Sequence, residues 1–467
     1  MIRLCASAAA AVLLAGCASF SPDGGFDRVA ELTRERTGQA PSYQRSAQDT
    51  LHAQARIDEL LAQPLSADAA VEVAFLNNRG LQADLHALGI AESELVRAGR
   101  LANPVFSFGR MREGQGAVEI ERSVMFNVLA LITRPVARQV EQRRFEQAQL
   151  QAASDAVALG AQARQAFYAA VAAQELVVYL QQVKEAADVS NELARRMVQA
   201  GNFNKLAQMR EQAFYADATS ELARAQHQAV AERERLTRAL GLWGPQLGFT
   251  LPQRLPDLPG APVEPLHAEQ TAMHKRLDVL ASRRSAEATA RALGLTRATG
   301  FVNVLELGYA NKSVSGEPRA NGYEVELELP LFDFGSTRRA RAEATYMQAV
   351  NRTAEMAVNA RSEVRESYSA YRTAYDLARH YRDEVVPLRK RISEENLLRY
   401  NGMLIGVFEL LADSREQVRA VSSYVQALRD FWIAETALST AVTGGSPATS
   451  AAVAGPAQAS APEAAAH

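Results

Sequence analysis

Apolar and acidic residues alternate along the stretch from Gly322 to Leu331. The apolar positions are Tyr323, Val325, Leu327, Leu329 and Leu331, and the acidic ones are Glu324, Glu326 and Glu328. Because successive side chains of a strand point to opposite faces, this alternation predicts a strand with one apolar and one carboxylate face. Such a strand suits a membrane barrel whose outer surface contacts lipid and whose interior contacts water.

Three earlier stretches of the chain alternate in the same way, at about 103–112, 117–128 and 301–310. The strand just described is the fourth along the chain, and we place it at about 322–332. In the second of these stretches Glu119 and Glu121 alternate with apolar residues. Gly114 and Gly116 indicate one turn, and Ser315-Gly316-Glu317-Pro318 indicates another. The chain therefore predicts two hairpins, whose strands have about the 9–11 residues that cross a tilted bilayer.

Long helical patterns fill most of the remaining chain. Apolar residues recur at helical spacing over about 66–100, 136–199, 206–240, 268–297, 336–400 and 403–442. The helix at 136–199 would be a rod of about 95 Å at 1.5 Å per residue. Its apolar positions are largely alanine, and small residues allow close lateral packing of helices in a coiled-coil manner. Tight reversals are expected at Gly201-Asn202-Phe203 and at Tyr400-Asn401-Gly402.

The two halves of the chain share this order of elements. Gly201 and Gly402 stand 201 residues apart, and the same offset places 128–133 on 329–334. We interpret this as an internal duplication. The expected segments are a signal peptide at 1–16, a tether with a short helix at 17–65, a first repeat at 66–243, a proline-rich connector at 244–266, a second repeat at 267–443 and a disordered tail at 444–467.

Composition and charge exclude several classes of protein. Across 467 residues the formal net charge is −2, which gives no general nucleic-acid signature. The two cysteines, Cys5 and Cys17, lie at the extreme N-terminus and fit neither a disulfide framework nor a metal cluster. Beyond the first twenty residues no apolar run reaches the roughly 18 residues of a transmembrane helix. If the protein spans a membrane, it does so with strands.

The N-terminus has the pattern of a secretory signal. Arg3 supplies the positive end, a short apolar stretch follows, and Leu14-Ala15-Gly16-Cys17 resembles a bacterial lipobox. In that pathway Cys17 receives the lipid and becomes the new N-terminus. Ala18 carries no acidic retention signal, which favours the outer membrane by resemblance to other lipoproteins. The alternative is an ordinary signal peptide with a chance cysteine.

Four strands are too few to close a membrane barrel. Unpaired backbone groups in lipid cost several kcal/mol each, and known barrels begin at eight strands. A dimer of this chain would supply eight strands and a trimer twelve. Since an eight-stranded barrel is filled by side chains, and the long helices could continue a wider barrel as a ring, we expect a trimeric tube. The alternative is that these strands form half-buried sheets of a soluble domain.

With these elements in place, the chain resembles the outer-membrane efflux protein family, typified by TolC, over about residues 66–443. The motifs that carry the resemblance are Leu329-Pro330-Leu331-Phe332-Asp333-Phe334-Gly335, Tyr400-Asn401-Gly402 with Glu409-Leu410-Leu411, Asn77-Asn78-Arg79-Gly80-Leu81, and Asn103-Pro104. The resemblance implies a mainly α fold with a β membrane part: a trimeric twelve-stranded β-barrel continued by an α-helical barrel across the periplasm.

The resemblance also implies partners and a gate. The duct would serve a tripartite efflux system, with a periplasmic adaptor protein and an inner-membrane efflux pump of the RND type. The turns match the family's periplasmic tip, so the candidate gate and adaptor-contact residues are Gly201, Asn202, Phe203, Tyr400, Asn401 and Gly402. The segment with Pro330, Asp333 and Gly335 would join barrel and tunnel. The tip glycine is offset by one position from the family's usual pattern, and Glu409 stands where aspartate is common.

We identify no catalytic constellation, metal site or cofactor motif in the sequence, and expect a passive conduit rather than an enzyme. We expect Glu119, Glu121, Glu324, Glu326 and Glu328 to line a wet lumen and to make it mildly cation-favouring. Arg338, Arg339 and Arg341 are interpreted as a solvated belt or, alternatively, as an anchor at the membrane interface. The competing function is a lipid-anchored periplasmic coiled-coil adaptor or scaffold, although adaptors of that kind carry a single helical hairpin.

Overall fold

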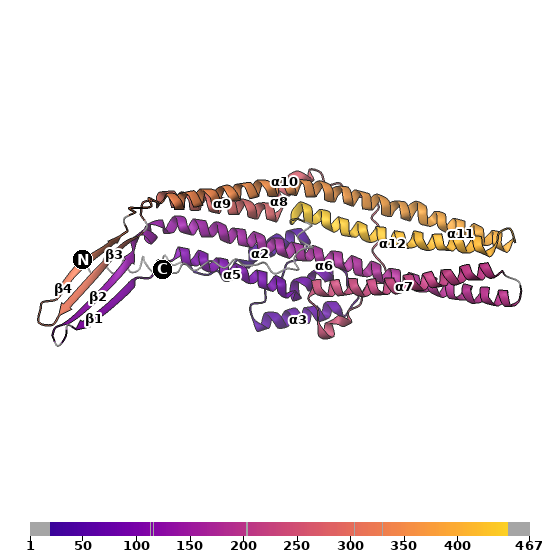
Figure 1. The fold of residues 1–467 in the computed structure, drawn as a ribbon, viewed down its shortest axis with the longest axis horizontal. Helices are drawn as coiled ribbons and strands as arrows, with labels where there is room; N and C mark the ends of the chain where they lie inside the picture. Colours follow the sequence, from indigo (N-terminus) through magenta and orange to yellow (C-terminus); the bar gives the residue numbers. More distant parts are fainter. Residues whose placement is uncertain are drawn as a thin grey trace. The chain divides into compact units, whose positions relative to one another are not determined.

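The computed structural model describes residues 19–446, apart from 113, 115, 202, 203, 303 and 329. The expected signal peptide, the Cys17 lipidation site and the tail from 447 onward lie outside the described residues, as do Asn202 and Phe203. The chain is mostly helical with one small antiparallel sheet, as the sequence predicts (Figure 1).

The elements follow one another along the chain as α2 (Phe26–Thr37), α3 (Ala47–Leu61), α4 (Ala67–Asn77), α5 (Arg79–Gly99), β1 (Val105–Arg112), β2 (Val118–Asn127), α6 (Val128–Gln199), α7 (Lys205–Leu240), the 3-10 helix η1 (Gly244–Gly248), α8 (Ala268–Lys275), α9 (Leu277–Ala298), β3 (Leu305–Val314), β4 (Ala320–Leu327), α10 (Ser336–His380), the π-helical turn η2 (Tyr381–Val385), α11 (Val386–Asn401) and α12 (Val407–Thr443).

The chain divides into two compact units, which are described separately. The first, called the strand unit, comprises Met1–Val29, Asp84–Ala152 and Asp278–Val358. The second, called the hairpin unit, comprises Ala30–Ala83, Ala153–Leu277 and Asn359–His467. Each long helix, α6 and α10, begins in the strand unit and continues into the hairpin unit.

The strand unit is built around a four-stranded antiparallel sheet in the order β1-β2-β3-β4. Every strand is joined to a helix at the same end of the sheet: α5 leads to β1, β2 to α6, α9 to β3, and β4 to α10. Ion pairs connect the helices below the sheet, with Arg143 of α6 lying 3.4 Å from Glu287 of α9. A hydrogen bond of 2.7 Å from Ser282 of α9 to Thr353 links α9 to α10.

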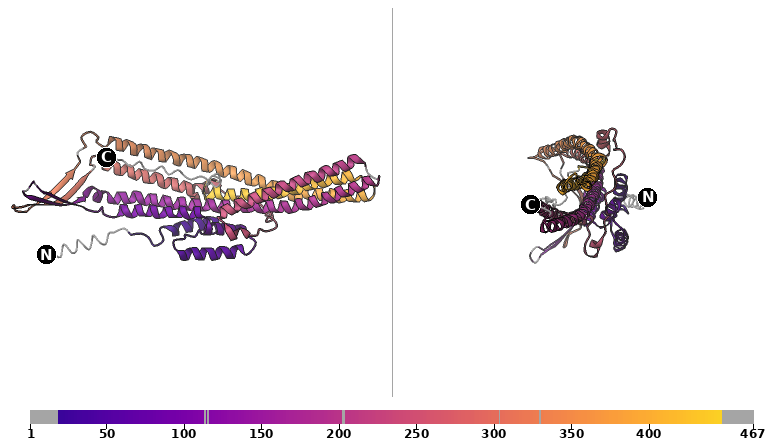
Figure 2. Two further views of the ribbon diagram at one scale, coloured as in Figure 1. Left: turned by 60° about the horizontal axis from the view of Figure 1, so that its bottom comes forward. Right: turned by 90° about the vertical axis from the view of Figure 1, so that its right-hand side faces the viewer.

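The core of the hairpin unit contains an aromatic cluster. Phe431 of α12 packs against Tyr371 and Tyr375 of α10, with ring centroids 5.6 and 5.8 Å apart. Tyr168 of α6 stacks on Trp432 at 5.3 Å. Away from this core, α7 runs back beside α6 and α12 runs back beside α11, so the unit ends in two antiparallel helical hairpins (Figure 2).

The proline-rich segment after α7 is held on this core. Leu251, Leu255 and Leu258 are buried among the core residues. The Tyr375 hydroxyl donates to the Pro259 carbonyl at 3.2 Å, and the Trp432 indole donates to the Pro256 carbonyl at 3.1 Å. Prolines therefore give this segment an extended course, and the leucines between them fix it to the helices.

The chain around residues 18–60 is more ordered than a tether with one short helix. The described residues form two helices, α2 and α3. Ser46 caps α3 in a capping box with Asp49, and Ile57 of α3 is buried in the core of the hairpin unit. The sequence signal for this helix was therefore present in the cap and in one apolar position.

Three helices that the sequence predicts as continuous are interrupted. Asn78, with ψ 116°, separates α4 from α5, and its amide donates to the Ala239 carbonyl at the end of α7. Arg276, with ψ 124°, separates α8 from α9 and turns its side chain into the core. The π-helical turn η2 precedes Pro387, whose missing N–H makes an irregular turn easier to accommodate.

The strand-to-helix junctions also differ from the prediction. Helix α6 begins at Val128 rather than 136, because the Asn127 side chain caps it by accepting a hydrogen bond from the Ala130 amide at 2.7 Å. Pro135 therefore lies inside the helix and does not start it. Strand β3 begins at Leu305 rather than 301, since the chain before it turns through a hydrogen bond from Val302 to Thr299. No helix in the described part of the chain combines the length and hydropathy needed to cross a membrane.

Candidate functional site

The sheet register collects acidic side chains on one face. Residues directly opposite each other on antiparallel strands point to the same side. Glu121 lies opposite Lys312, Glu306 opposite Glu326, and Gly308 opposite Glu324. We call this side the glutamate face; its acidic members are Glu119, Glu121, Glu306, Glu324 and Glu326. Glu328 follows β4 and extends the ladder by donating its backbone N–H to the Val304 carbonyl at 3.3 Å.

Two charged residues of this face were not singled out from the sequence. The Lys312 ammonium lies 3.2 Å from the Glu121 carboxylate and also pairs with Glu119. Glu306 adds a carboxylate opposite Glu326. Lys312 was missed because the predicted strand ended at 310, whereas β3 continues to Val314. The lysine offsets part of the negative charge contributed by the strand β2 glutamates.

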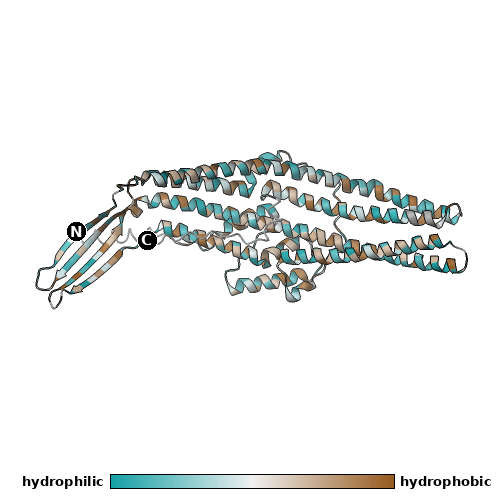
Figure 3. Ribbon diagram, in the orientation of Figure 1, coloured by the Kyte–Doolittle hydropathy of each residue, from teal (hydrophilic) through white to brown (hydrophobic). Residues whose placement is uncertain are grey.

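The opposite side of the sheet, called the apolar face, is built from aromatic and aliphatic residues. Figure 3 shows hydrophilic and hydrophobic residues alternating along the strands. Its apolar members are Phe106, Phe108, Val118, Ile120, Val124, Phe126, Leu305, Leu307, Tyr309, Tyr323, Val325 and Leu327. Most are exposed in the single chain, and Tyr323 is the most exposed of them at 87%. A contiguous exposed apolar surface of this kind marks a contact with lipid or with another protein.

A polar row borders the most apolar part of this face. Asn311 accepts a hydrogen bond from Arg122 at 3.2 Å and donates one to Asn321 at 2.6 Å. In the adjoining row, the rings of Tyr309 and Tyr323 meet edge to face at 6.3 Å. The apolar band, measured along the strands from the polar row to the helix end of the sheet, is about 20 Å long at 3.4 Å per residue. Tyrosines at the border of an apolar band are typical of a membrane–water interface.

The segment between β4 and α10 forms a compact joint. The Asp333 carboxylate accepts hydrogen bonds from the Ser336 amide at 2.9 Å and from the Thr337 hydroxyl, and so caps the first turn of α10. These hydrogen bonds, foremost that from Thr337, hold the pKa of the Asp333 carboxyl below its ordinary value.

Gly335 and Pro330 complete this joint. Gly335 has φ 77°, and a side chain there would collide with the Gly300 carbonyl from the segment before β3. Pro330 is partly buried. The three residues predicted to form a joint therefore lie between β4 and α10, but the two strand-to-helix junctions of the chain differ: β2 passes directly into α6, whereas several non-helical residues separate β4 from α10.

The first helical hairpin reverses between Gln199 and Lys205. Gly201 has φ 77°, a conformation that glycine adopts without strain. The Asn204 side chain accepts from the Ala207 amide at 2.7 Å and starts α7. The candidate residues Asn202 and Phe203 occupy the part of this turn outside the described residues.

The second helical hairpin reverses in a different way. Gly402 has φ −77°, and the left-handed residue is Met403 with φ 58°. Met403 and Leu404 are exposed at 93% and 77%, whereas Tyr400 is exposed at 39%. Tyr400, Asn401 and Gly402 thus lie at the hairpin end, as expected, and the most exposed apolar side chains come directly after them.

The two hairpins contact each other near these ends. The guanidinium of Arg415 on α12 donates to the Arg210 carbonyl of α7 at 3.2 Å and lies 4.5 Å from the ring centroid of Phe214. Arg415 was not singled out from the sequence, because a lone arginine on a helical pattern gives no sign of which helix it contacts.

Solved structures resemble this chain along most of its length. The outer-membrane channel OprN superposes with a TM-score of 0.70 at 18% identity, covering 87% of this chain and 95% of that one. The outer-membrane protein VceC of Vibrio cholerae gives 0.68 at 15% identity, covering 86% and 99%. The Campylobacter jejuni CmeC outer-membrane channel gives 0.66 at 14% identity, covering 89% and 91%. No protein-family model and no curated protein sequence matches this chain.

Proposed function

We propose that this protein, which has the fold of outer-membrane channels, is the outer-membrane exit duct of a tripartite efflux system. The observation that carries the proposal is the sheet, which has one charged face and one apolar face. A barrel wall needs this division when its outside contacts lipid and its inside contacts water. The likeness of fold and the TolC-type motifs point to the same function.

The proposed duct is a homotrimer. In the described sheet β1 and β4 are edge strands, and an open edge inside a bilayer would leave backbone groups unpaired at a cost of several kcal/mol each. Pairing β4 of one copy with β1 of the next removes these edges. Three copies would give twelve strands, enough for an open passage, whereas eight would leave an interior filled by side chains.

We further propose that the protomer arose by internal duplication, with repeats at 66–243 and 267–443 joined by the connector at 244–266. In support, the order of helix, two strands, long helix and returning helix occurs twice along the chain. The interruptions at Asn78 and Arg276 also occupy comparable places, since each divides the helical segment that leads into a strand pair. The junctions after β2 and β4 have diverged.

The proposed location is the outer membrane, with the helices extending into the periplasm. Residues 1–16 would direct secretion, and Cys17 would carry the lipid anchor. The apolar face would contact lipid, and the glutamate face would line the lumen. No acid/base or nucleophilic arrangement is needed for a passive conduit, and the proposal assigns no enzymatic activity and no cofactor.

The hairpin ends are proposed as the periplasmic gate and the contact for a periplasmic adaptor protein, which would join the duct to an inner-membrane efflux pump of the RND type. The exposed apolar side chains of Met403 and Leu404 support a protein contact at this end. Arg415 supports the gate, because it ties α12 to α7 just behind the turns.

Extraction and mass measurement test the proposal. The full-length protein, expressed with its own signal in a Gram-negative host, is expected in the outer-membrane fraction and to require detergent. Native mass spectrometry should then give three times the mass of one processed chain. A monomeric mass after extraction would contradict the duct and favour the alternative, a lipid-anchored periplasmic adaptor or scaffold.

A further inference from the structure

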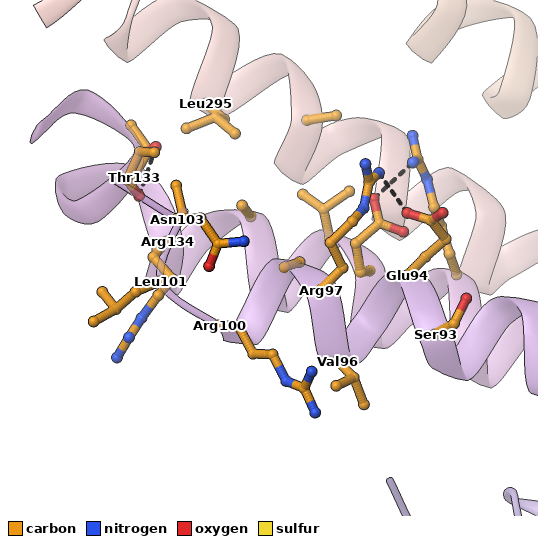
Figure 4. A pocket seen from close by; sticks show the side chains of 18 of the residues that line it. Ser93, Glu94, Val96, Arg97, Arg100, Leu101, Asn103, Thr133, Arg134 and Leu295 are labelled. Carbon is orange, nitrogen blue, oxygen red and sulfur yellow. Dashed lines mark hydrogen bonds and ion pairs between the residues drawn. The ribbon is translucent and has the colours of Figure 1, made fainter. Parts of the chain in front are cut away.

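A pocket lies in the strand unit directly below the helix end of the sheet, among α5, α6 and α9 (Figure 4). Its volume is about 790 Å³, within the range of ligand sites. Asn103, two residues before β1, and Ala130, three residues after β2, both line it. If the sheet spans a membrane, this pocket therefore lies at the level of the lipid headgroups on the periplasmic side.

The pocket lining carries an excess of positive charge. It contains Arg97, Arg100, Arg134 and Arg144 against Glu94 and Glu141. Arg97 pairs with Glu94 at 2.5 Å, and Arg144 pairs with Glu141 at 2.7 Å. The lining therefore holds four guanidinium groups against two carboxylates. Arg134 has no ion pair or hydrogen bond with another described side chain, and Arg100 lies over the ring of Phe20 at 5.9 Å.

Apolar side chains are mixed with these arginines. Figure 4 shows Leu101 beside Arg134, with Arg100 farther along α5. Phe20 is 54% exposed and Leu101 40%. Ile132, the fifth residue of α6 and next to the lining residue Thr133, is 66% exposed. Guanidinium groups beside an exposed apolar shelf match an amphiphile with an anionic head and apolar chains, and not a small soluble anion.

Phe20 also indicates whether the pocket opens toward the outside or the lumen of the proposed barrel. It follows Cys17 by three residues, a distance of at most about 11 Å of extended chain. A lipid on Cys17 would enter the bilayer around the outside of the duct, so the pocket would open toward that bilayer. Its lining residues lie below β1, β2 and β3, so of the two edges that would join neighbouring copies it lies near β1 and away from β4.

We propose that this pocket binds the headgroup of an anionic phospholipid in the periplasmic leaflet, with Arg100 and Arg134 on the phosphodiester and Phe20, Leu101 and Ile132 against the proximal acyl chains. This inference rests on the proposed function, because that function places the pocket at the leaflet. The arginines would fix the depth and rotation of the strand unit in the membrane.

Lipid titration of the purified full-length protein in detergent, followed by native mass spectrometry, tests the proposal. Phosphatidylglycerol should bind at least tenfold more tightly than phosphatidylcholine. The variant Arg100→Gln/Arg134→Gln should weaken phosphatidylglycerol binding about thirtyfold, the effect of removing two charges at a lipid surface, and leave phosphatidylcholine binding unchanged. Arg134→Gln alone, which removes no described contact, should weaken phosphatidylglycerol binding about sixfold.

The matched control is Arg138→Gln/Arg352→Gln, which removes two exposed arginines of the same unit that do not line the pocket. It should change phosphatidylglycerol binding by less than threefold. Equal losses in both double variants, no preference for the anionic lipid, or displacement of the lipid by millimolar inorganic phosphate would each overturn the proposal. Pore formation by the same preparations reports on the duct separately, since a conducting protein without lipid preference contradicts only the lipid site.

Discussion

Lys312 of β3 lies opposite Glu121 of β2, with its ammonium 3.2 Å from the carboxylate, and it pairs with Glu119 from the same position. One cation thus serves two of the glutamates that the sequence assigns to the lumen. Glu306, Glu324 and Glu326 lie on the same face without a lysine or arginine directly opposite them. The acidic character of the proposed lumen is therefore concentrated on β3 and β4.

Removing this lysine should increase cation selectivity. In Lys312→Gln, Glu119 and Glu121 would face the lumen without a counter-charge, so the reversal potential in a salt gradient should shift toward that of a cation-selective pore. Neutralising Glu324 and Glu326 to glutamine should shift it the opposite way. Arg112→Gln removes a charge from the other face of the sheet and should leave the reversal potential unchanged. Identical selectivity in all these variants would show that this face does not line the conduction path.

Gly335 should tolerate no side chain. Gly335→Ala would place a methyl group against the Gly300 carbonyl at φ 77°, which combines left-handed strain of about 1–2 kcal/mol with a backbone collision. Gly316→Ala has the same kind of strain, at φ 90°, but meets no atom within 4 Å. The melting temperature in detergent should fall clearly more for Gly335→Ala. Equal decreases in the melting temperatures of the two variants would mean that the close contact between Gly335 and the Gly300 carbonyl does not contribute to stability.

Asp333 should make the joint sensitive to acid. Hydrogen bonds lower the pKa of its carboxyl in the folded protein, so its contribution to stability is present above the ordinary value of 3.8 and is lost as the pH falls through the lower folded value. Asp333→Asn should therefore melt below the wild type at pH 7, and the difference should narrow as the pH falls from 5 to 2. A difference that stays constant over this range would exclude the ionised carboxylate as its source.

Arg276 should be needed for stability. Its side chain is fully buried, donates to Glu363 at 2.7 Å and approaches the carbonyls of Ala360 and Ala441. Arg276→Ala leaves an acid partner and carbonyls without their donor, which should cost about 3–5 kcal/mol. Arg365→Ala breaks an ion pair with Glu269 in which the arginine is 62% exposed, and should cost less than about 1 kcal/mol. Urea unfolding monitored by tryptophan fluorescence compares the two.

Arg415 should hold the hairpin ends together. Arg415→Ala removes the hydrogen bond to Arg210 and the contact with Phe214, so α12 should separate more easily from α7. The expected result is a several-fold higher open probability in planar bilayers. Arg419→Ala provides the control, because its recorded ion pair is with Glu416 on its own helix at 2.6 Å. Unchanged gating in Arg415→Ala would remove this contact from the proposed gate.

The sequence predicted the elements whose pattern is local. Period-two alternation located all four strands, and the glutamates it picked out on β2 and β4 lie on one face because that alternation also fixes which residues share a face. The hairpin turns near Gly201 and Gly402 were found because glycine and asparagine interrupt otherwise continuous helical patterns.

Features that depend on distant partners were not predicted. Arg276 interrupts a helical pattern because its side chain is drawn into a core made by α10 and α12, and nothing near it in the sequence indicates that core. The left-handed residue of the second turn is Met403 and not the neighbouring glycine, which the sequence does not indicate. Lys312 was excluded by an error of four residues in one strand boundary, although its neighbours on the face were identified.

Single-channel recording tests the central claim most directly. The purified full-length protein, reconstituted into planar lipid bilayers, is expected to insert as a trimer and to produce discrete conductance steps whose ion selectivity changes in Lys312→Gln. A protein that binds the bilayer without conducting would contradict the account of this chain as an outer-membrane duct. A pore whose selectivity no change on the glutamate face alters would contradict the assignment of that face to the lumen.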